Sequence, residues 1–354
     1  MHQLCMIAQK RIYKPIRRFN MTARLKSVAI LFAAMLCSVT GSAAATFTGM
    51  VVIGDSLSDQ GNAFSISSSI LPFPVPPLEY TDGTSVGRFT NGRNYIDYLS
   101  STLGLTVFPS LAGGSNYATG GARTDSASIG GFPIGPFSLL DQRNAYLDSL
   151  TGEADPGALH VVWGGSNDLT DIVEAVIADP GFNPFPEIEN AVNDIADIVE
   201  SLAVANAKSI LVPNVPNLGL VPLITAGGPP VPEASVLSSL FNTDLATAMD
   251  DLSDLYPDTD LIEFDVFSVL TDAFLDPAAF GFTNVTDACY SLFGLPGGTT
   301  CTNPDEYLSW DGFHPTTATH SILAANMAVP LPAALWLFAT GMVSLLGLAY
   351  RRRA

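Results

Sequence analysis

The chain has 354 residues, of which 47% are hydrophobic and 14% charged. This length is enough for one large domain or two small ones. All 34 acidic residues lie between residues 46 and 328, where only five residues are basic, so this part has a net charge of about −29. So acidic a surface repels nucleic acid and anionic lipid headgroups, which excludes a nucleic-acid-binding protein.

Residues 1–45 are predicted to be an N-terminal extension and a secretory signal peptide. Two basic residues precede an apolar run at 28–36, and three alanines at 43–45 provide a small-residue cleavage site. Met21 suits the start of such a peptide better than Met1 does, so the first 20 residues are interpreted as an artefact of start-codon choice. A membrane anchor is the alternative, but the apolar run is short for one.

Three short apolar runs, at 50–53, 159–163 and 209–213, are bounded by turn residues and do not alternate with polar ones. This pattern is typical of strands buried on both faces, as in a parallel sheet. Between the last two runs, residues 186–207 have apolar side chains at helical spacing. Strand, helix and strand at these lengths predict a βαβ unit.

A second helix is expected over 234–255 and a further strand around 261–267. The alternation of elements predicts an α/β fold, a three-layer α/β/α sandwich with a mainly parallel central sheet. Two stretches rich in Ser, Pro and Gly, at 65–87 and 109–137, are predicted to be loops within one domain spanning 46–328. The sequence has no phosphate-cradling glycine motif, which counts against nucleotide chemistry.

A candidate nucleophile follows the first predicted strand. Gly54 breaks the apolar run, and Ser56 comes just past this break. A strand-to-helix turn exposes a serine and places it beside free backbone N–H donors. An ordinary tight turn is the alternative when Gly-Asp-Ser is taken alone.

A nucleophilic serine needs a base and a carboxylate that orients this base. Residues 46–328 contain three histidines: His160 opens a predicted buried strand, and His320 lies in a predicted helix. His314 instead lies in a turn-rich segment three residues after Asp311, so one short loop can present both groups. The alternatives are a helix cap for Asp311 and a surface position for His314.

Donors for an oxyanion can also be nominated. Gly120 and Gly121 allow a backbone N–H to approach a substrate closely. Asn167 follows a predicted strand directly, and open α/β sheets bind ligands at this edge. Taken singly, each of these segments also fits a simple tight turn.

Taken together and in this order, these segments resemble the blocks of the GDSL, or SGNH, hydrolase family. The resemblance covers residues 50 to 325 and is closest to the lipase/acylhydrolase subgroup. The matching segments are 54–59, 120–121, 165–168 and 311–314, with further subgroup-like segments at 87–92 and 212–214. The order Ser, Asp, His also occurs in α/β-hydrolases, but there the serine follows a central strand.

The resemblance implies a flavodoxin-like sandwich and a serine esterase. It makes Ser56 the nucleophile, His314 the base and Asp311 the partner of this base. The oxyanion hole would combine the Ser56 N–H, the Gly121 N–H and the Asn167 amide, although either Gly120 or Gly121 could be the glycine donor. No metal or organic cofactor is implied.

Cys289 and Cys301 are expected to form a disulfide, because both lie in a short loop of a protein bound for an oxidising compartment. A metal site would need more ligands than cluster around this pair.

Residues 329–354 are predicted to be a C-terminal sorting signal. An apolar run at 333–350 is long enough to span a bilayer, and three arginines follow it, which should remain cytoplasmic. Val-Pro-Leu-Pro-Ala at 329–333, this run and the arginines resemble the PEP-CTERM/VPLPA signals of Gram-negative bacteria, which an exosortase recognises. A plain tail anchor is the alternative.

These observations predict a secreted or surface-sorted esterase or lipase, which contacts the membrane only through its C-terminal tail. The substrate could be a lipid, a small ester or an acylated polysaccharide, and the sorting signal favours the polysaccharide only by association. The alternative function is a catalytically idle adhesion or matrix protein on the same fold.

Overall fold

A computed structural model of the chain describes residues 47–129, 132–133 and 137–328. The signal peptide and the sorting signal predicted from the sequence lie outside these residues. Within them, no helix combines the length and apolarity that a membrane crossing requires.

Four parallel strands form the central sheet. They are β1 (Met50–Gly54), β4 (Leu159–Trp163), β5 (Ser209–Pro213) and β6 (Asp260–Phe264), and they lie side by side in this order. Every residue of β1 and β4 is buried, as expected for non-alternating apolar runs. The expectation of a strand to residue 267 is wrong at its end, because the Asp265 side chain caps the next helix by accepting from the Ser268 N–H.

An extended segment, residues 115–119, lies parallel to β1 on its free edge. The N–H of Tyr117 donates to the carbonyl of Val52 at 2.8 Å, and the N–H of Thr119 donates to Gly54 at 3.1 Å. The chain therefore reaches the two neighbours of β1 through helices on opposite faces of the sheet. Such a switch point opens a crevice at the carboxyl ends of the strands, where α/β proteins bind ligands.

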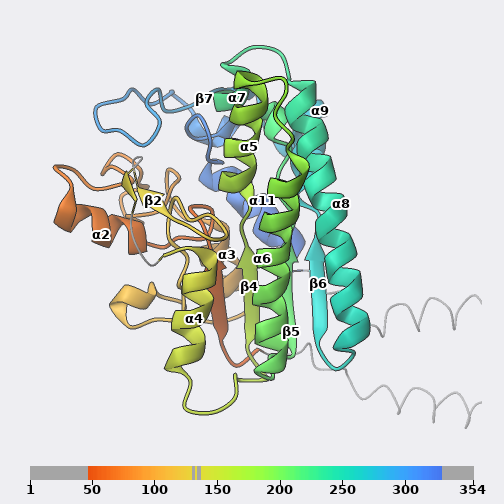
Figure 1. Cartoon of the computed structure of the whole chain (residues 1–354). Coiled ribbons are helices and arrows are strands. Elements are labelled where there is room, and N and C mark those ends of the chain that lie inside the picture. Colours follow the sequence, from red (N-terminus) through yellow and green to blue (C-terminus); the bar gives the residue numbers. More distant parts are fainter. Residues whose placement is uncertain (1–46, 130–131, 134–136, 329–354) are drawn as a thin grey trace, which may run out of the picture. The chain divides into compact units, whose positions relative to one another are not determined.

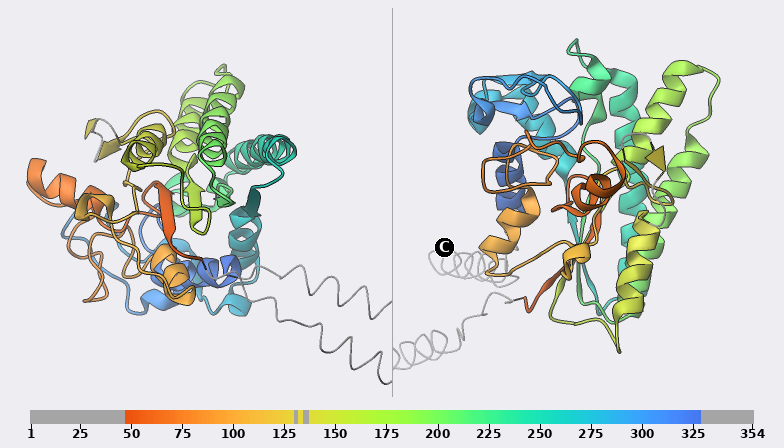
Figure 2. Two further views of the ribbon diagram at one scale, coloured as in Figure 1. Left: turned by 90° about the horizontal axis from the view of Figure 1, so that it is seen from below. Right: turned by 90° about the vertical axis from the view of Figure 1, so that its left-hand side faces the viewer.

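Helices cover both faces of the sheet, which gives the predicted three-layer sandwich (Figure 2). One face is covered by α4 (Leu139–Ser149), α5 (Ser166–Ala178), α6 (Phe185–Val204) and α8 (Pro232–Leu255). The other is covered by α3 (Tyr95–Thr102), α9 (Val266–Leu275) and α11 (Thr317–Met327).

The helices predicted at 186–207 and 234–255 correspond to α6 and α8. Helix α6 ends three residues earlier than expected, because Asn206 adopts a positive φ of 80° and the Ala207 N–H turns back to the carbonyl of Leu202. Helices α3, α4 and α5 were not expected from the sequence. The N-caps of α3 and α4, Asn94 and Ser138, both form capping boxes with an aspartate three residues later.

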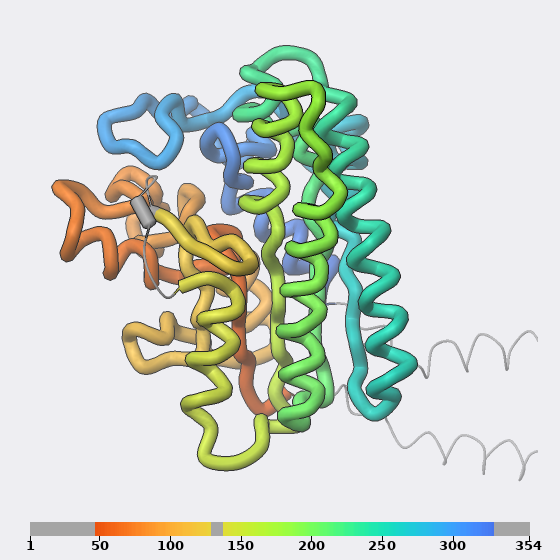
Figure 3. The backbone as a smooth tube through the Cα atoms, viewed as in Figure 1, coloured from red at the N-terminus to blue at the C-terminus, as the bar shows by residue number. Residues whose placement is uncertain are grey.

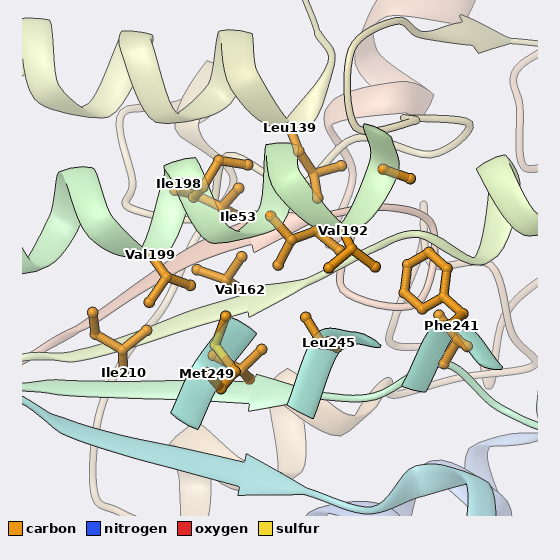
Figure 4. Packing of buried hydrophobic residues seen from close by; sticks show 14 of the residues in the cluster. Ile53, Leu139, Val162, Val192, Ile198, Val199, Ile210, Phe241, Leu245 and Met249 are labelled. Carbon is orange, nitrogen blue, oxygen red and sulfur yellow. The ribbon is translucent and has the colours of Figure 1, made fainter. Parts of the chain in front are cut away.

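The larger core lies between the sheet and the helices α4, α5, α6 and α8. Figure 4 shows Ile53 and Val162 of the sheet packed against Val192 and Val199 of α6 and against Met249 of α8. Each such side chain is buried and contributes roughly 1.5–3 kcal/mol to folding. This packing makes the strand ends a rigid support for the turns that follow them.

Shorter elements surround the carboxyl ends of the strands (Figure 1). They are α2 (Asn62–Ile70), η1 (Ser110–Ala112), β2 (Ser128–Ile129), β3 (Phe132–Pro133), η2 (Leu218–Leu220), α7 (Pro222–Thr225), α10 (Pro277–Phe280), β7 (Asn284–Ala288), η3 (Pro304–Glu306) and β8 (Tyr307–Ser309). Helix α2 runs to Ile70, so the first residues of the segment 65–87, which was expected to be a loop, are helical. The hydroxyls of Ser67 and Ser68 bond carbonyls one turn earlier instead of competing for the backbone in a turn.

Candidate active site

Ser56 lies in the turn that follows β1. A Cβ atom on Gly54 would lie 2.7 Å from the carbonyl oxygen of Trp163, so only glycine fits at the end of β1, where its backbone passes this close to β4. The Gln142 side chain of α4 accepts from the Gly54 N–H at 2.8 Å and donates to the Gly54 carbonyl at 2.9 Å. This pair of hydrogen bonds fixes the backbone two residues before Ser56.

The carboxylate of Asp59 holds the other side of this turn. One oxygen accepts from the N–H groups of Gly61 and Asn62, and the other accepts from those of Ala63 and Gly120, all at 2.7–3.0 Å. Burial raises the pKa of Asp59, and these four donors offset part of that effect. The bond to Gly120 joins the serine turn to the glycine pair, two segments 61 residues apart in the sequence.

Asp311 and His314 lie in the turn between β8 and α11, and the structure brings both to Ser56. The Nδ1 atom of His314 lies 2.8 Å from Oδ2 of Asp311, and its Nε2 atom lies 2.8 Å from Oγ of Ser56. The other oxygen of Asp311 accepts from the backbone N–H groups of Phe313 and His314 at 2.7 and 2.6 Å. Asp311 is not a helix cap, since Thr316 caps α11, and His314 is 3% exposed.

The carboxylate of Asp311 is held in its charged form. Burial alone would raise its pKa, but the charge of His314 and the hydrogen bonds from His314 and Phe313 outweigh burial and lower the pKa below its usual 3.8. A charged Asp311 can orient the imidazole and stabilise it when it takes a proton.

The other two described histidines play no part in this arrangement. His160 lies within β4, where its Nε2 bonds the hydroxyl of Tyr146 at 2.9 Å, and burial lowers its pKa to about 4. His320 lies in α11, and burial lowers its pKa to about 3. Neither bonds Ser56, so His314 alone among the described histidines contacts the serine hydroxyl.

The glycine pair separates into two roles. The N–H of Gly120 is occupied by Asp59, whereas the N–H of Gly121 has no hydrogen-bond partner among the described residues. Gly121 has a φ of 80°, and a Cβ atom there would lie 1.7 Å from the carbonyl oxygen of Ser128. Gly121, rather than Gly120, can therefore donate to a substrate.

Asn167 lies in the first turn of α5, directly after β4. Its Nδ2 atom donates to the carbonyl of Ala122 at 2.8 Å, which orients the amide and leaves the second N–H of the same nitrogen available. The N-terminus of a helix adds a partial positive charge at this position. Ser56, Gly121 and Asn167 line one pocket.

Comparison with known proteins shows the family of the chain. The family model for GDSL-like lipase/acylhydrolase matches residues 50–327. The chain belongs to this family. It is a hydrolase that acts on ester bonds.

Relatives of this GDSL hydrolase include several GDSL esterase/lipase proteins of Arabidopsis thaliana. One is 28% identical over 348 residues, covering 85% of this chain and 93% of the relative. Another is 26% identical over 317 residues, covering 79% of this chain and 90% of the relative.

Solved structures also match the chain. A member of the lipolytic G-D-S-L family from Veillonella parvula is 9% identical with a TM-score of 0.41, covering 80% of this chain and 98% of that one. A catalytic mutant of an acetylxylan esterase from Geobacillus stearothermophilus is 14% identical with a TM-score of 0.40, covering 79% and 91%.

The pocket of this GDSL hydrolase has a volume of about 590 Å³, within the usual range for small-molecule sites. Apolar side chains form most of its wall. They are Leu71, Pro72, Phe73, Val75, Phe89, Phe293, Leu295 and Phe313. Its polar side chains are those of Ser56, Arg123, Ser128, Asn167 and His314, so the pocket presents an apolar space beside a small set of hydrogen-bonding groups.

A disulfide between Cys289 and Cys301 closes the loop that supplies part of this wall. Residues 289–301 lie next to the orange segment around residues 71–86 (Figure 3), and the N–H of Gly297 donates to the Glu79 side chain at 2.8 Å. Within the described part of the chain, no group of three or more His, Cys, Asp or Glu side chains is arranged to hold a metal ion.

Two residues near the triad of Ser56, His314 and Asp311 were not identified from the sequence. Tyr80 donates a hydrogen bond to Asp311, and the ring of Phe293 stacks on that of His314 with centroids 5.7 Å apart. Tyr80 lies in a proline-rich segment 231 residues before Asp311. No local spacing relates the two, so only the three-dimensional arrangement could identify this contact.

Proposed function

We propose that this hydrolase cleaves carboxylic esters through an acyl-enzyme formed on Ser56. The observation that supports this most directly is the continuous chain from Ser56 Oγ through His314 to Asp311, with both contacts at 2.8 Å. Ser56 and His314 line the apolar pocket. Gly121 and Asn167 line it as well, and they supply a backbone N–H and a side-chain amide as hydrogen-bond donors.

In the proposed reaction, His314 takes the proton of the Ser56 hydroxyl as the oxygen attacks the ester carbonyl. The negative charge on the carbonyl oxygen is stabilised by the N–H groups of Ser56 and Gly121 and by the Asn167 amide. Collapse of this intermediate breaks the C–O bond, and His314 gives its proton to the departing alcohol. A water molecule then repeats the sequence on the acyl-enzyme and releases the acid, while Asp311 stays charged throughout.

We infer an apolar acyl group in the substrate. Leu71, Phe73, Val75 and Leu295 surround the space next to Ser56, and burying such a group there yields about 0.8 kcal/mol per CH₂. A polysaccharide ester would place sugar hydroxyls against these walls without hydrogen-bond partners, which costs free energy. The pocket therefore favours a lipid or another apolar ester over the acylated polysaccharide considered from the sequence.

The test uses the purified protein and p-nitrophenyl esters of increasing acyl length. Wild type is expected to hydrolyse esters of medium acyl length faster than the acetate, and the Ser56→Ala variant is expected to lose about 10⁴-fold or more in kcat. Unfolding of both proteins in urea checks that the variant folds. Equal activity of wild type and a folded Ser56→Ala variant would refute the mechanism, and a preference for acetylated polysaccharide would refute the apolar acyl group.

We also propose secretion followed by sorting at the cell surface of a Gram-negative bacterium. Support comes from the signal-peptide pattern at 1–45, the sorting-signal pattern at 329–354 and the disulfide, which is typical of oxidising compartments. Mass spectrometry of the surface protein tests both ends. Peptides from residues 333–354 on that protein would contradict cleavage by an exosortase-type enzyme.

A further inference from the structure

Tyr80 makes a contact with the triad that no step of the proposed mechanism uses. Its hydroxyl donates to Oδ2 of Asp311 at 2.7 Å, the same oxygen that receives the His314 ring. The side chain is fully buried, in the segment that also supplies Leu71, Phe73 and Val75 to the pocket wall. A hydrogen bond from a buried hydroxyl to a charged carboxylate is stronger than an ordinary hydrogen bond between neutral groups.

Aromatic packing fixes the direction of this hydroxyl. The Tyr80 ring meets Tyr290 edge-on, with centroids 5.2 Å apart, and meets Trp310 edge-on at 5.5 Å. Tyr290 and Trp310 stack on each other at 5.3 Å, next to the Cys289–Cys301 disulfide. Edge-to-face rings have a preferred geometry, so the cluster holds Tyr80 in one orientation.

The same hydroxyl also receives a hydrogen bond from the disulfide-closed loop 289–301. The N–H of Gly294 donates to it at 3.0 Å. In Figure 1 this loop, in light blue, lies above the orange segment around α2 at the carboxyl ends of the strands. Within the described part of the chain, Tyr80 thus provides the single hydroxyl that bonds both the loop over the pocket and the carboxylate of the triad.

Tyr80 can only act as a proton donor toward Asp311. Burial raises its pKa, and the neighbouring charge of Asp311 raises it further, so the hydroxyl keeps its proton throughout the working pH range. Its donated hydrogen bond stabilises the charged carboxylate and limits how strongly that carboxylate attracts the imidazolium.

Building on the proposed acyl-enzyme function, we propose that Tyr80 is a positioning residue of the reaction: it orients Asp311, tunes its strength as an acceptor and transmits the position of loop 289–301 to the triad. The hydroxyl bonds Asp311 and the Gly294 N–H and makes no hydrogen bond to Ser56. Its effect therefore reaches the substrate through His314.

The test compares Tyr80→Phe with wild type in kcat, KM and the pH dependence of kcat/KM. Loss of one hydrogen bond to a charged group should lower kcat by about tenfold, with KM within about twofold. Asp311 without this donor stabilises the imidazolium more strongly, so the acid limb of kcat/KM should move to higher pH by about half a unit.

Two control variants separate this role from a merely structural one. Tyr146→Phe likewise removes a buried tyrosine hydroxyl, but this hydroxyl bonds the Nε2 atom of His160 and no residue of the triad. The variant should leave kcat and the acid limb unchanged. Tyr290→Phe removes a hydroxyl that bonds Leu295 and Gly298 within the loop, without touching Asp311. It should leave the acid limb in place if the proposal is right.

A variant with a ring-fluorinated tyrosine at position 80 retains the shape of the native side chain. It should therefore fold even if Tyr80→Phe does not. Its more acidic hydroxyl donates more strongly, so the acid limb should move to lower pH. Unchanged kcat and pH profiles in both Tyr80 variants would overturn the proposal, as would a fall in kcat that Tyr290→Phe reproduces without a pH shift. Activity that survives Ser56→Ala would instead refute the proposed function, which makes the two failures distinguishable.

Discussion

The two halves of the site are built in different ways. The half that would stabilise the oxyanion, with Ser56, Gly121 and Asn167, follows the ends of buried strands and the start of α5. The half that would move the proton, with Asp311 and His314, lies in a turn between two short elements. Side-chain contacts, an aromatic cluster and a disulfide-closed loop hold this second half in place.

This difference has a physical consequence. The strand ends are fixed by parallel hydrogen bonding and by a core on both faces, and the buried side chains of Gln142 and Asp59 tie the turns with the oxyanion donors to them. The proton-transfer half depends on individual contacts such as those of Tyr80 and Phe293 with the triad. We therefore expect changes in the loops to act on proton transfer and to leave oxyanion stabilisation intact.

The largest effect tests the oxyanion half. Asn167→Ala should lower kcat by about 10²–10³-fold with little change in KM, because the amide would act on charge that develops only in the transition state. The acid limb of the pH profile should stay in place, since Asp311 and His314 are untouched. Asn190→Ala, at an exposed position of α6, is the matched control. A loss expressed in KM alone would show that Asn167 binds the ground state instead.

A smaller effect is expected from the loop. The double variant Cys289→Ser, Cys301→Ser should lose about 3 kcal/mol of unfolding free energy in the chain-entropy model, measured by urea unfolding. Its kcat should fall by about tenfold, because the bond from Gly294 to Tyr80 and the stacking of Phe293 on His314 depend on the closed loop.

The same double variant sharpens the comparison when Asn167→Ala is added to it. If the two halves are independent, Asn167→Ala should cost the same factor with and without the disulfide, as expected for sites without shared contacts. Strongly non-additive losses would contradict the separation into two halves.

The sequence predicted the oxyanion half and the triad residues more readily than the contacts that support them. Strand ends, glycine pairs and the short spacing between Asp311 and His314 are local signals, and the parallel sheet follows from apolar runs. Tyr80 and Phe293 come from loops whose composition is compatible with many conformations, so their contacts with the triad depend on tertiary packing. Asp59 is intermediate: its position beside Ser56 is local, but its bond to Gly120 is not.

Two buried aspartates, Asp55 and Asp311, differ in the direction of their pKa shifts. Asp311 receives hydrogen bonds from Tyr80, Phe313 and His314, and its pKa is lowered. Asp55 is equally buried but accepts from the Leu57 N–H at 2.9 Å, and burial raises its pKa to about 7. Burial therefore favours the neutral form, even at Asp59 with its four N–H donors, unless a neighbouring charge such as that of His314 outweighs it.

This contrast predicts a difference in stability with pH. Between its unfolded pKa near 3.8 and its folded pKa of about 7, Asp55 binds its proton in the folded state and releases it on unfolding. The unfolding free energy should therefore fall as pH rises through this window, by up to about 1.4 kcal/mol per pH unit. Asp311 has the opposite sign, since its stabilisation is present above pH 3.8 and lost as the pH falls through its lowered folded pKa.

Asp55→Asn isolates the first of these terms, because an asparagine oxygen can still accept from the Leu57 N–H but does not ionise. Urea unfolding of wild type and variant from pH 4 to pH 7 should give curves that diverge, with the variant gaining relative stability as the pH rises. The difference between the two curves cancels every other titrating group that the proteins share. Parallel curves would mean that Asp55 ionises in the folded protein as it does in the unfolded chain, and that burial beside Ser56 is offset as fully as it is at Asp311.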